Sequence, residues 1–454
     1  MAEYDFAIIG AGAAGEACAF EALRLGASVA IIERELFGGS CPFWACMPSK
    51  ALLHAAGVHA LGGDYAWPRA SEFRDYMINR ERRDWPDDTG HVNRLRDAGA
   101  DVIRGAAKVI GPGRVQVNGD DGRREVRGRF LIVAVGTHSA VPDLPGLDSI
   151  AGWSNREATS TRDLPRSLLV LGGGPTGVEM AQVMARYGVP VSVVHPTDHL
   201  NHRDHPRSSE YVADGLRHDG VTLRLGVRAE RIRAGAGDDA AHRFELSDGS
   251  HVDAHEVLFA IGRTAPLKDL GLETLGVSVD DEERVQPDDH LRIADDTYVI
   301  GDPAGPEMHT HLAHYEGEIV ARMALGKDVT PDFRAIPRAI YTDPEAAGVG
   351  LLLEQAKAGG LDALELTVDL ATSAKGYVSE SVGHATIVVD RGSRTLVGTF
   401  IAGPGASEAI HMAVLAVKAR TPVAVLADTI TAFPTTSRAL GGLFVEADRA
   451  LARG

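Results

Sequence analysis

The chain is poor in cysteine and in positive charge, and it has no long apolar run. Only 3 of its 454 residues are cysteines, which excludes a small disulfide-stabilised scaffold. A formal net charge of −17 repels phosphate backbones and anionic lipid surfaces, so neither nucleic acid nor a membrane is an expected partner. Residues 4–5 lead directly into an expected first β-strand at residues 6–10, which leaves no room for a charged leader and a cleavable apolar stretch. We therefore expect a cytoplasmic protein.

Two of the three cysteines stand close together. Cys41 and Cys46 lie in the segment GGSCPFWACMPSK at residues 38–50. A redox motif in a chain otherwise poor in cysteine is more often catalytic than structural. Residues five apart on a regular helix have Cα atoms about 8 Å apart, beyond the reach of a disulfide. Pairing the two therefore requires an irregular helical start, for which Pro42 is suited; the alternative is two unrelated buried thiols.

A glycine turn occurs twice, and it is the strongest pattern in the sequence. Gly10, Gly12 and Gly15 follow an apolar run, and the same spacing returns 162 residues later. The second copy consists of Gly172, Gly174 and Gly177. Each copy has the order strand, turn, helix, strand that gives a G-x-G-x-x-G match its meaning. Glycines allow the backbone to approach a pyrophosphate, which the helix N-terminus then binds. The sequence therefore predicts two dinucleotide sites.

The residue that ends the second strand of each copy differs. Glu33 ends the first and could bind ribose hydroxyls, whereas His195 stands at the equivalent position of the second. A site without that acid does not repel a 2′-phosphate, which favours NADPH, although NADH remains an alternative. Residues downstream either supply positive charge or are solvated loop residues: His202, Arg203 and Arg207.

In order along the chain, these motifs resemble the FAD-dependent pyridine nucleotide-disulfide oxidoreductases, such as dihydrolipoamide dehydrogenase, glutathione reductase and mercuric reductase. Further matches are AVGT at 134–137, AIGR at 260–263, YVIGD at 298–302, LAH at 312–314 and YTDPE at 341–345. The resemblance implies an α/β fold with two Rossmann-like dinucleotide-binding domains, a C-terminal α+β dimerisation domain, and a homodimer. The implied segments are an FAD-binding domain at 1–149 with a returning part at 266–332, an NAD(P)-binding domain at 150–265, and an interface domain at 333–454.

The resemblance also implies FAD and NADPH or NADH as cofactors, and a role for individual residues. Cys46 is expected to face the flavin and Cys41 to attack the acceptor, while Lys50 pairs with Glu179 beside the flavin. Two exposed helix residues are the alternative for that pair, and Cys18 is expected in the core. The residues implied to contact the cofactors are Gly10, Gly12, Gly15, Glu33, Gly39, Ser40, Gly136, Asp302, Ala313, Gly172, Gly174, Gly177, His195, Gly262 and Arg263.

The catalytic signature near the C-terminus departs from the family pattern. Where the lipoamide and glutathione enzymes carry His-Pro-Thr-x-x-Glu, this chain has Phe433 and Arg438 at the histidine and glutamate positions. Phenylalanine cannot transfer a proton, and that contribution is typically worth about 10²–10⁴-fold. We therefore do not expect lipoamide or glutathione disulfide as the substrate. Mercury is disfavoured as well, because no cysteine follows Cys46.

These features predict an FAD-dependent NAD(P)H oxidoreductase (EC 1.-). Hydride would pass to FAD and on through Cys41 and Cys46 to a non-standard small acceptor, apolar or aromatic. Phe43 and Trp44 either line its channel or pack in the core. The alternative is a flavin that directly reduces or dehydrogenates a quinone-like or planar aromatic metabolite, for example in biosynthesis, with the dithiol auxiliary. No metal site is predicted, since the spacing of His309, His311 and His314 does not share one helix face.

Overall fold

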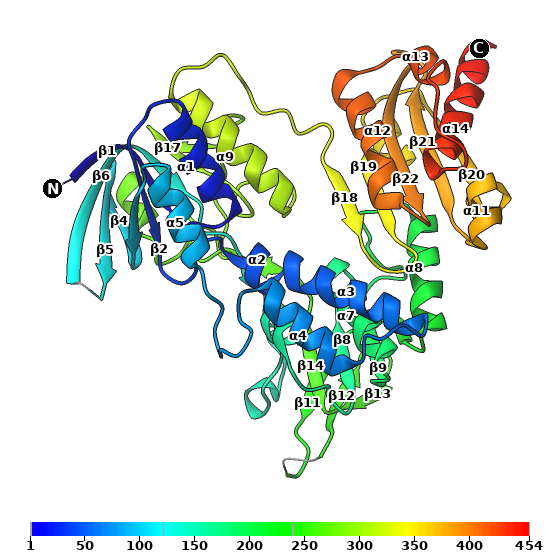
Figure 1. Ribbon diagram of the computed structural model, residues 1–454, viewed down its shortest axis with the longest axis horizontal. Helices are drawn as coiled ribbons and strands as arrows, with labels where there is room; N and C mark the ends of the chain where they lie inside the picture. The colour runs from blue at the N-terminus through cyan, green and yellow to red at the C-terminus, as the bar shows by residue number, and fades with distance from the viewer. Residues whose placement is uncertain (1, 121, 238–239, 454) are drawn as a thin grey trace. The chain divides into compact units, whose positions relative to one another are not determined.

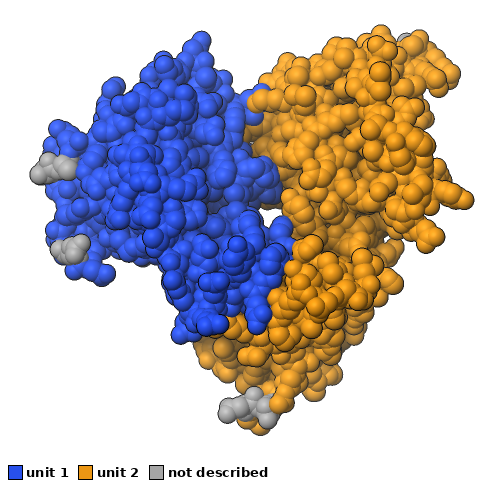
Figure 2. Space-filling model, viewed as in Figure 1, with its two compact units in different colours: residues 1–51, 71–140, 262–332 blue, residues 52–70, 141–261, 333–454 orange. Residues whose placement is uncertain are grey.

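The computed structural model describes residues 2–120, 122–237 and 240–453. Two compact units make up the chain (Figure 2): unit 1 contains residues 1–51, 71–140 and 262–332, and unit 2 contains residues 52–70, 141–261 and 333–454. Helices α3 (Cys46–Ala60) and α4 (Trp67–Met77) contribute residues to both. The finer division into four segments remains a prediction.

Unit 1 is built on a mainly parallel sheet. The apolar runs 6–9 and 29–32 are buried, as is typical of parallel strands covered on both faces. The strand order is β16 (Arg292–Ala294), β17 (Thr297–Val299), β6 (Gly122–Val133), β1 (Ala2–Ile9), β2 (Val29–Glu33) and β3 (Asp101–Arg104). Strands β17, β6, β1, β2 and β3 pair in parallel. Their carboxyl ends therefore meet at one edge, where ligands of such sheets bind.

The remaining elements of unit 1 extend or cover this sheet. Antiparallel strands β4 (Ala106–Gly111) and β5 (Arg114–Gly119) continue it from β6, and β7 (His138–Ser139) pairs with β15 (Arg263–Thr264). The helices are α1 (Ala13–Arg24), α2 (Ser40–Trp44), α5 (Thr89–Asp97) and α9 (Thr310–Ala324), beside the unit 1 parts of α3 and α4.

Helices α1 and α9 lie side by side (Figure 1). Their backbones approach so closely that a Cβ on Gly317 would stand 2.4 Å from the Ala14 carbonyl oxygen and 2.8 Å from the Cys18 nitrogen. Cys18 is fully buried at this contact, and burial raises the pKa of its thiol. The prediction that Cys18 is a small core residue is confirmed.

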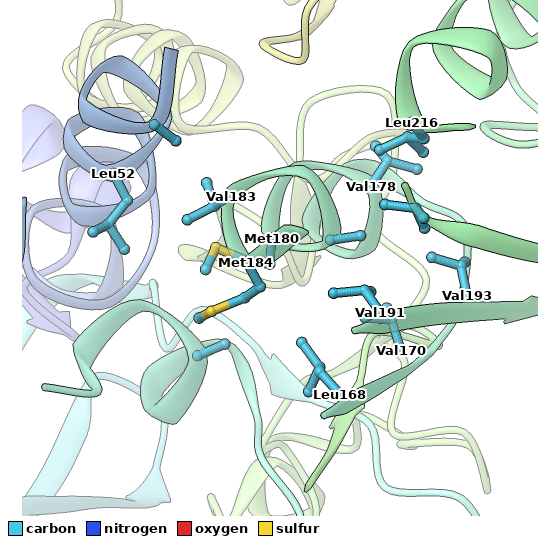
Figure 3. Close-up of a cluster of buried hydrophobic side chains, with 14 of the residues drawn as sticks. Leu52, Leu168, Val170, Val178, Met180, Val183, Met184, Val191, Val193 and Leu216 are labelled. Carbon is cyan, nitrogen blue, oxygen red and sulfur yellow. The ribbon is translucent and has the colours of Figure 1, made fainter. Parts of the chain in front are cut away.

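Unit 2 repeats the parallel arrangement with the second glycine turn. Its strands run in the order β10 (Thr222–Leu225), β9 (Val191–His195), β8 (Leu168–Leu171) and β14 (Glu256–Phe259), all parallel. The helices of this part are α6 (Asn155–Ser160), α7 (Pro175–Arg186) and α8 (Pro206–His218), and an antiparallel ribbon consists of β11 (Ala229–Arg233), β12 (His242–Leu246) and β13 (His251–Ala254). Side chains of α7, such as Val178 and Met184, pack against Leu168 and Val191 of the sheet (Figure 3).

The C-terminal part of unit 2 is an antiparallel sheet with helices. The strand order is β18 (Pro337–Ile340), β19 (Ala346–Gly350), β22 (Thr395–Ala402), β21 (His384–Asp390) and β20 (Ala363–Asp369). The helices are α10 (Leu353–Ala358), α11 (Ala374–Ser379), α12 (Ala406–Ala419), α13 (Val423–Ala427) and α14 (Thr436–Leu451). Ile387, Ile401, Ile410 and Phe444 share one buried cluster. The predicted fold class, two parallel dinucleotide-type sheets and a C-terminal α+β part, is confirmed.

Among residues 2–120, 122–237 and 240–453, every helix is too short or too polar to cross a bilayer.

Candidate active site

The first glycine turn joins β1 to α1. Gly10 has φ +101°, and a Cβ there would stand 2.2 Å from the Ala134 carbonyl oxygen. A Cβ on Gly15 would stand 1.9 Å from the Gly10 carbonyl oxygen, so neither position admits a side chain. Helix α1 begins after its N-cap residue, Gly12. This glycine has no side chain that could accept a hydrogen bond from the N–H groups of the first helical turn. The turn therefore has the form of an anion-binding helix start.

Glu33 stands at the end of β2, as predicted. One carboxylate oxygen accepts the Ala11 N–H at 2.9 Å and the other accepts the Glu35 N–H at 2.7 Å. Burial raises the pKa of Glu33, and these two backbone hydrogen bonds oppose that rise. The two carboxylate oxygens of Glu33 are thus held beside the glycine turn by the backbone N–H groups of Ala11 and Glu35.

Asp302 follows β17 and lies in a polar cluster of unit 1. The Thr137 hydroxyl donates to Asp302 at 2.5 Å. Arg263 donates from Nε to the Thr137 hydroxyl at 2.6 Å, and this Nε lies 3.4 Å from the Asp302 carboxylate. Three motifs far apart in the sequence, AVGT, AIGR and YVIGD, therefore meet at one carboxylate.

Glu316, on α9, supports the same region. Its carboxylate accepts the Gly301 N–H at 2.6 Å, while the other oxygen, Oε1, is buried without a hydrogen-bond partner among the described residues. Burial raises the pKa of Glu316 to about 8. This side chain was not predicted, because an acid within a helical pattern has no distinguishing local signal.

The second glycine turn reproduces the first in unit 2. A Cβ on Gly172 would stand 2.2 Å from the Ala260 carbonyl oxygen, and one on Gly177 would stand 2.1 Å from the Gly172 carbonyl oxygen. Gly174 is the N-cap residue of α7. His195 ends β9, and its Nδ1 accepts the Gly173 N–H at 3.0 Å. Its Nε2 is buried and has no hydrogen-bond partner in the described part of the chain.

The dithiol segment contains the predicted irregularity. Helix α2 ends at Trp44, Ala45 adopts φ −131° and ψ −95°, and α3 starts at Cys46 (Figure 1). The break lies between the two cysteines, neither of which forms a disulfide in this structure. Gly39, with φ +71°, precedes α2, and a Cβ on it would stand 2.6 Å from the Gly12 Cα atom. The dithiol segment thus packs directly against the first glycine turn.

The two thiols are hydrogen-bonded to each other, and both interact with Thr310. The Cys46 sulfur lies 3.3 Å from the Thr310 hydroxyl of α9. A hydrogen bond with Cys46, and then burial, raise the pKa of the Cys41 thiol. Thr310 was missed at the sequence level, because 264 residues separate it from Cys46 and no spacing connects them.

Cys41 also lines a cavity of about 450 Å³ that lies within unit 1. Much of its lining is apolar, from Ala13, Ala17, Phe20, Pro42 and Met47, and polar side chains complete it. Among these, Glu16 and His91 were not predicted as site residues. A carboxylate directly after the third glycine of an otherwise apolar helix start was the available signal for Glu16.

The other predicted site residues are distributed over both units. Lys50 belongs to unit 1 and Glu179 to unit 2, so their pairing remains a prediction; Glu179 is buried on α7 and accepts the Tyr341 N–H at 3.0 Å. Phe433 is 74% exposed. The remaining positions are Ser40 at the start of α2, Gly136 with φ +63°, Gly262 with φ +149° and Ala313, buried in α9.

Phe43 and Trp44 are core residues. They share a buried cluster with Leu36 and Ile78, and the Trp44 ring packs edge-on against Trp85 at 5.2 Å. Of the two readings, core packing is therefore the one that the structure favours. Within the described residues there is no group of three or more potential metal-ligating side chains.

Comparison with known proteins gives matches over nearly the whole chain. Residues 4–317 match the family described as pyridine nucleotide-disulphide oxidoreductase, and residues 336–443 match its dimerisation domain. Dihydrolipoyl dehydrogenase of Halobacterium salinarum is 31% identical over 463 residues, which cover 96% of this chain and 94% of the relative. Mercuric reductase of Staphylococcus aureus is 28% identical over 453 residues, which cover 96% and 81%.

Solved structures of similar fold include RclA and LpdA. The Cu(II) complex of the HOCl-induced flavoprotein disulfide reductase RclA from Escherichia coli has a TM-score of 0.87 at 26% identity, covering 98% of this chain and 100% of that one. LpdA from Mycobacterium tuberculosis has a TM-score of 0.86 at 26% identity, covering 99% and 100%. Together with the two glycine turns and the dithiol segment, these matches show that the chain belongs to the pyridine nucleotide-disulfide oxidoreductases, enzymes that use FAD and NAD(P)H.

Proposed function

We propose that this enzyme uses NAD(P)H to reduce a small apolar or aromatic acceptor, and that Cys46 and Cys41 deliver the electrons. The observation that carries the proposal is the position of Cys41 on a cavity whose lining is apolar in part, with Cys46 beyond the helix break at Ala45. An acceptor in that cavity meets a thiol, and the second thiol is available to resolve a covalent intermediate by exchange.

The residues of unit 1 fit FAD. The first turn has no room for a Cβ at Gly10 or Gly15, so the backbone can approach a pyrophosphate. Glu33 would bind the adenosine ribose, and Asp302 would bind the ribityl chain. Bound FAD accepts hydride from NAD(P)H and supplies an electron pair to a disulfide. The first glycine turn and the carboxylates of Glu33 and Asp302 would orient the cofactor. Lys50 with Glu179 would provide a charged pair beside it.

For the nicotinamide nucleotide we propose the second turn. Gly172, Gly174 and Gly177 would hold its pyrophosphate at the start of α7. His195 stands where an NAD site has a carboxylate. It is neutral when its Nδ1 accepts a backbone N–H, so this position brings no negative charge to the ribose pocket. This supports NADPH as a nucleotide at least as good as NADH.

The acceptor follows from the cavity and from Phe433. The apolar part of the lining, from Ala13, Ala17, Phe20, Pro42 and Met47, favours an apolar or aromatic molecule. The lack of histidine and glutamate at positions 433 and 438 argues against lipoamide and glutathione disulfide, whose enzymes use those residues. We also propose a homodimer, supported by the match to a dimerisation domain and by the exposure of Ile430 and Phe433, 97% and 74%.

Direct reduction of a quinone-like acceptor by the flavin, with the dithiol auxiliary, is the second candidate, and the loss of the C-terminal histidine favours it. Anaerobic titration of the holoenzyme with NADPH separates the two. A long-wavelength thiolate-to-flavin charge-transfer band is expected from the dithiol route. Complete flavin bleaching without that band would refute the dithiol route and support the direct one.

A further inference from the structure

A histidine bound to a carboxylate lies on the same cavity as Cys41. We propose that His91, oriented by Glu16, transfers the protons in the reaction of Cys41 with its acceptor, the task for which position 433 has no suitable side chain. The inference rests on the proposed function in one respect, that Cys41 is the thiol which meets the acceptor.

The pairing of His91 with Glu16 joins α5 to α1. Nδ1 of His91 lies 2.9 Å and 3.1 Å from the two carboxylate oxygens of Glu16. An ionised carboxylate only accepts hydrogen bonds, so Nδ1 carries the proton and Nε2 presents its lone pair. No other described residue is hydrogen-bonded to this ring. The arrangement is that of a base whose tautomer and orientation are fixed by a neighbouring acid.

The ring lies against the segment that carries Cys41. A Cβ on Gly38 would stand 2.7 Å from both Cε1 and Nε2 of His91, so the glycine leaves the room that the imidazole occupies. The Phe43 ring packs edge-on against it at 5.7 Å. The His91 side chain is 23% exposed, which leaves it accessible to a molecule in the cavity.

Other charged groups share this cavity with His91 and Glu16. They are Glu21 and Arg24 on α1, Arg94 on α5, and His314 and Glu318 on α9. Glu21 accepts hydrogen bonds from Arg24 and Arg322, and chiefly the Arg24 bond holds the pKa of Glu21 at about 2. Arg94 lies over the Phe20 ring at 5.4 Å. Of the two histidines, His91 is the one with a carboxylate on Nδ1.

Cys41 requires such a group. The hydrogen bond with Cys46 and burial raise the pKa of Cys41, so its thiol is protonated at neutral pH, and only the thiolate is a nucleophile. An oriented imidazole on the same cavity supplies a proton acceptor, as in other cysteine–histidine sites.

The acceptor in this reaction is a disulfide R–S–S–R′. Nε2 of His91 takes the proton of Cys41, and the thiolate attacks one sulfur, forming a Cys41–S–R bond while the S–S bond breaks. The electron pair leaves on R′–S⁻, which takes the proton back from His91. Cys46 then attacks Cys41, and the Cys41–Cys46 disulfide forms as R–S⁻ leaves with the proton of Cys46. The two electrons come from the reduced dithiol, which NAD(P)H regenerates.

Leaving groups of different acidity test this role. Holoenzyme reduced anaerobically with dithionite is mixed with hydroxyethyl disulfide, whose thiol is a poor leaving group, or with dithiobis(nitrobenzoate), whose thiol leaves without a proton. His91→Gln should slow the first reaction by about a hundredfold and the second by less, so that the ratio of the two rate constants falls roughly tenfold or more. Glu16→Gln should change the ratio in the same direction. The pH profile of the first reaction should differ in shape between His91→Gln and wild type.

His251→Gln is the matched control, since this exposed histidine lies 3.8 Å from Asp253 on β13, and its ratio should equal that of wild type. An unchanged ratio in His91→Gln, with equal slowing of both disulfides, would show a merely structural role and overturn the inference while the proposed function stands. Failure of wild type to react with either disulfide would overturn both.

Discussion

His195 accepts the N–H of Gly173 in the second glycine turn, as Glu33 accepts the N–H of Ala11 in the first. The distances are 3.0 Å to Nδ1 and 2.9 Å to the carboxylate. The two side chains thus serve the same structural purpose in turns of the same form, but only the first brings a negative charge.

This difference predicts nucleotide preference. NADPH should reduce the flavin at least as efficiently as NADH in matched anaerobic stopped-flow measurements, because no carboxylate at position 195 repels a 2′-phosphate. His195→Glu should lower the efficiency with NADPH relative to NADH by about tenfold or more. A clear preference of the wild-type enzyme for NADH would contradict the interpretation.

Cys46→Ser should abolish the thiolate-to-flavin band on reduction while FAD stays bound. The glycine turn, Glu33 and Asp302 are expected to hold the cofactor, and none of them depends on this sulfur. Visible spectra of the purified variant, followed by anaerobic titration, give both readouts. Cys18→Ala is the control, since Cys18 is buried between α1 and α9. A band of wild-type intensity in Cys46→Ser would rule out the assigned role.

Glu316→Gln should alter the pH dependence of stability. The pKa of the buried carboxyl is about 8 in the folded protein and about 4.3 in an unfolded chain. Between these values the folded state holds one proton more than the unfolded state, so stability falls as pH rises. The glutamine variant lacks this loss. Its free energy of unfolding relative to wild type should rise by up to about 1.4 kcal/mol per pH unit over that range.

Thermal or denaturant unfolding at constant ionic strength measures that difference. A constant offset between Glu316→Gln and wild type across the range would mean that Glu316 is ionised in the folded protein.

Phe433 provides a test of acceptor choice. Wild-type turnover of lipoamide or glutathione disulfide should lie well below about 10 s⁻¹. Phe433→His with Arg438→Glu should raise it about tenfold or more, because an oriented imidazole can protonate a leaving thiolate. Any residual wild-type turnover should depend on His91. Reduction of a quinone, measured in parallel, should not rise; wild-type disulfide turnover at typical enzymatic rates would disprove the expectation.

Local spacing was enough to predict the two glycine turns and the break in the dithiol segment. A side chain on Gly15 or Gly177 would meet the carbonyl oxygen of the glycine five residues earlier, and the interval between Cys41 and Cys46 required the break that Ala45 provides. These are constraints between neighbours in the sequence, so a sequence pattern expresses them.

The surroundings of the dithiol could not be predicted in the same way. Thr310 of α9 reaches Cys46 of α3, and His91 of α5 reaches Glu16 of α1, only because the fold of unit 1 brings these helices together. The contact between His91 and Glu16 spans 75 residues, and neither residue has a spacing or composition that marks its partner. Phe43 and Trp44 were ambiguous for a related reason, since an aromatic pair has the same sequence whether it faces a channel or a core.

The contact between Gly39 and Gly12 has a consequence for engineering. With no side chain on either residue, the start of α2 packs directly against the first glycine turn, without intervening side-chain atoms. A dithiol helix grafted from another enzyme would therefore have to be transferred together with the glycine turn against which it packs. A side chain at position 39 would displace that turn, because its Cβ would stand 2.6 Å from the Gly12 Cα atom, whereas a Cβ on Gly12 would lie 3.8 Å from the Gly39 Cα atom, an ordinary contact distance.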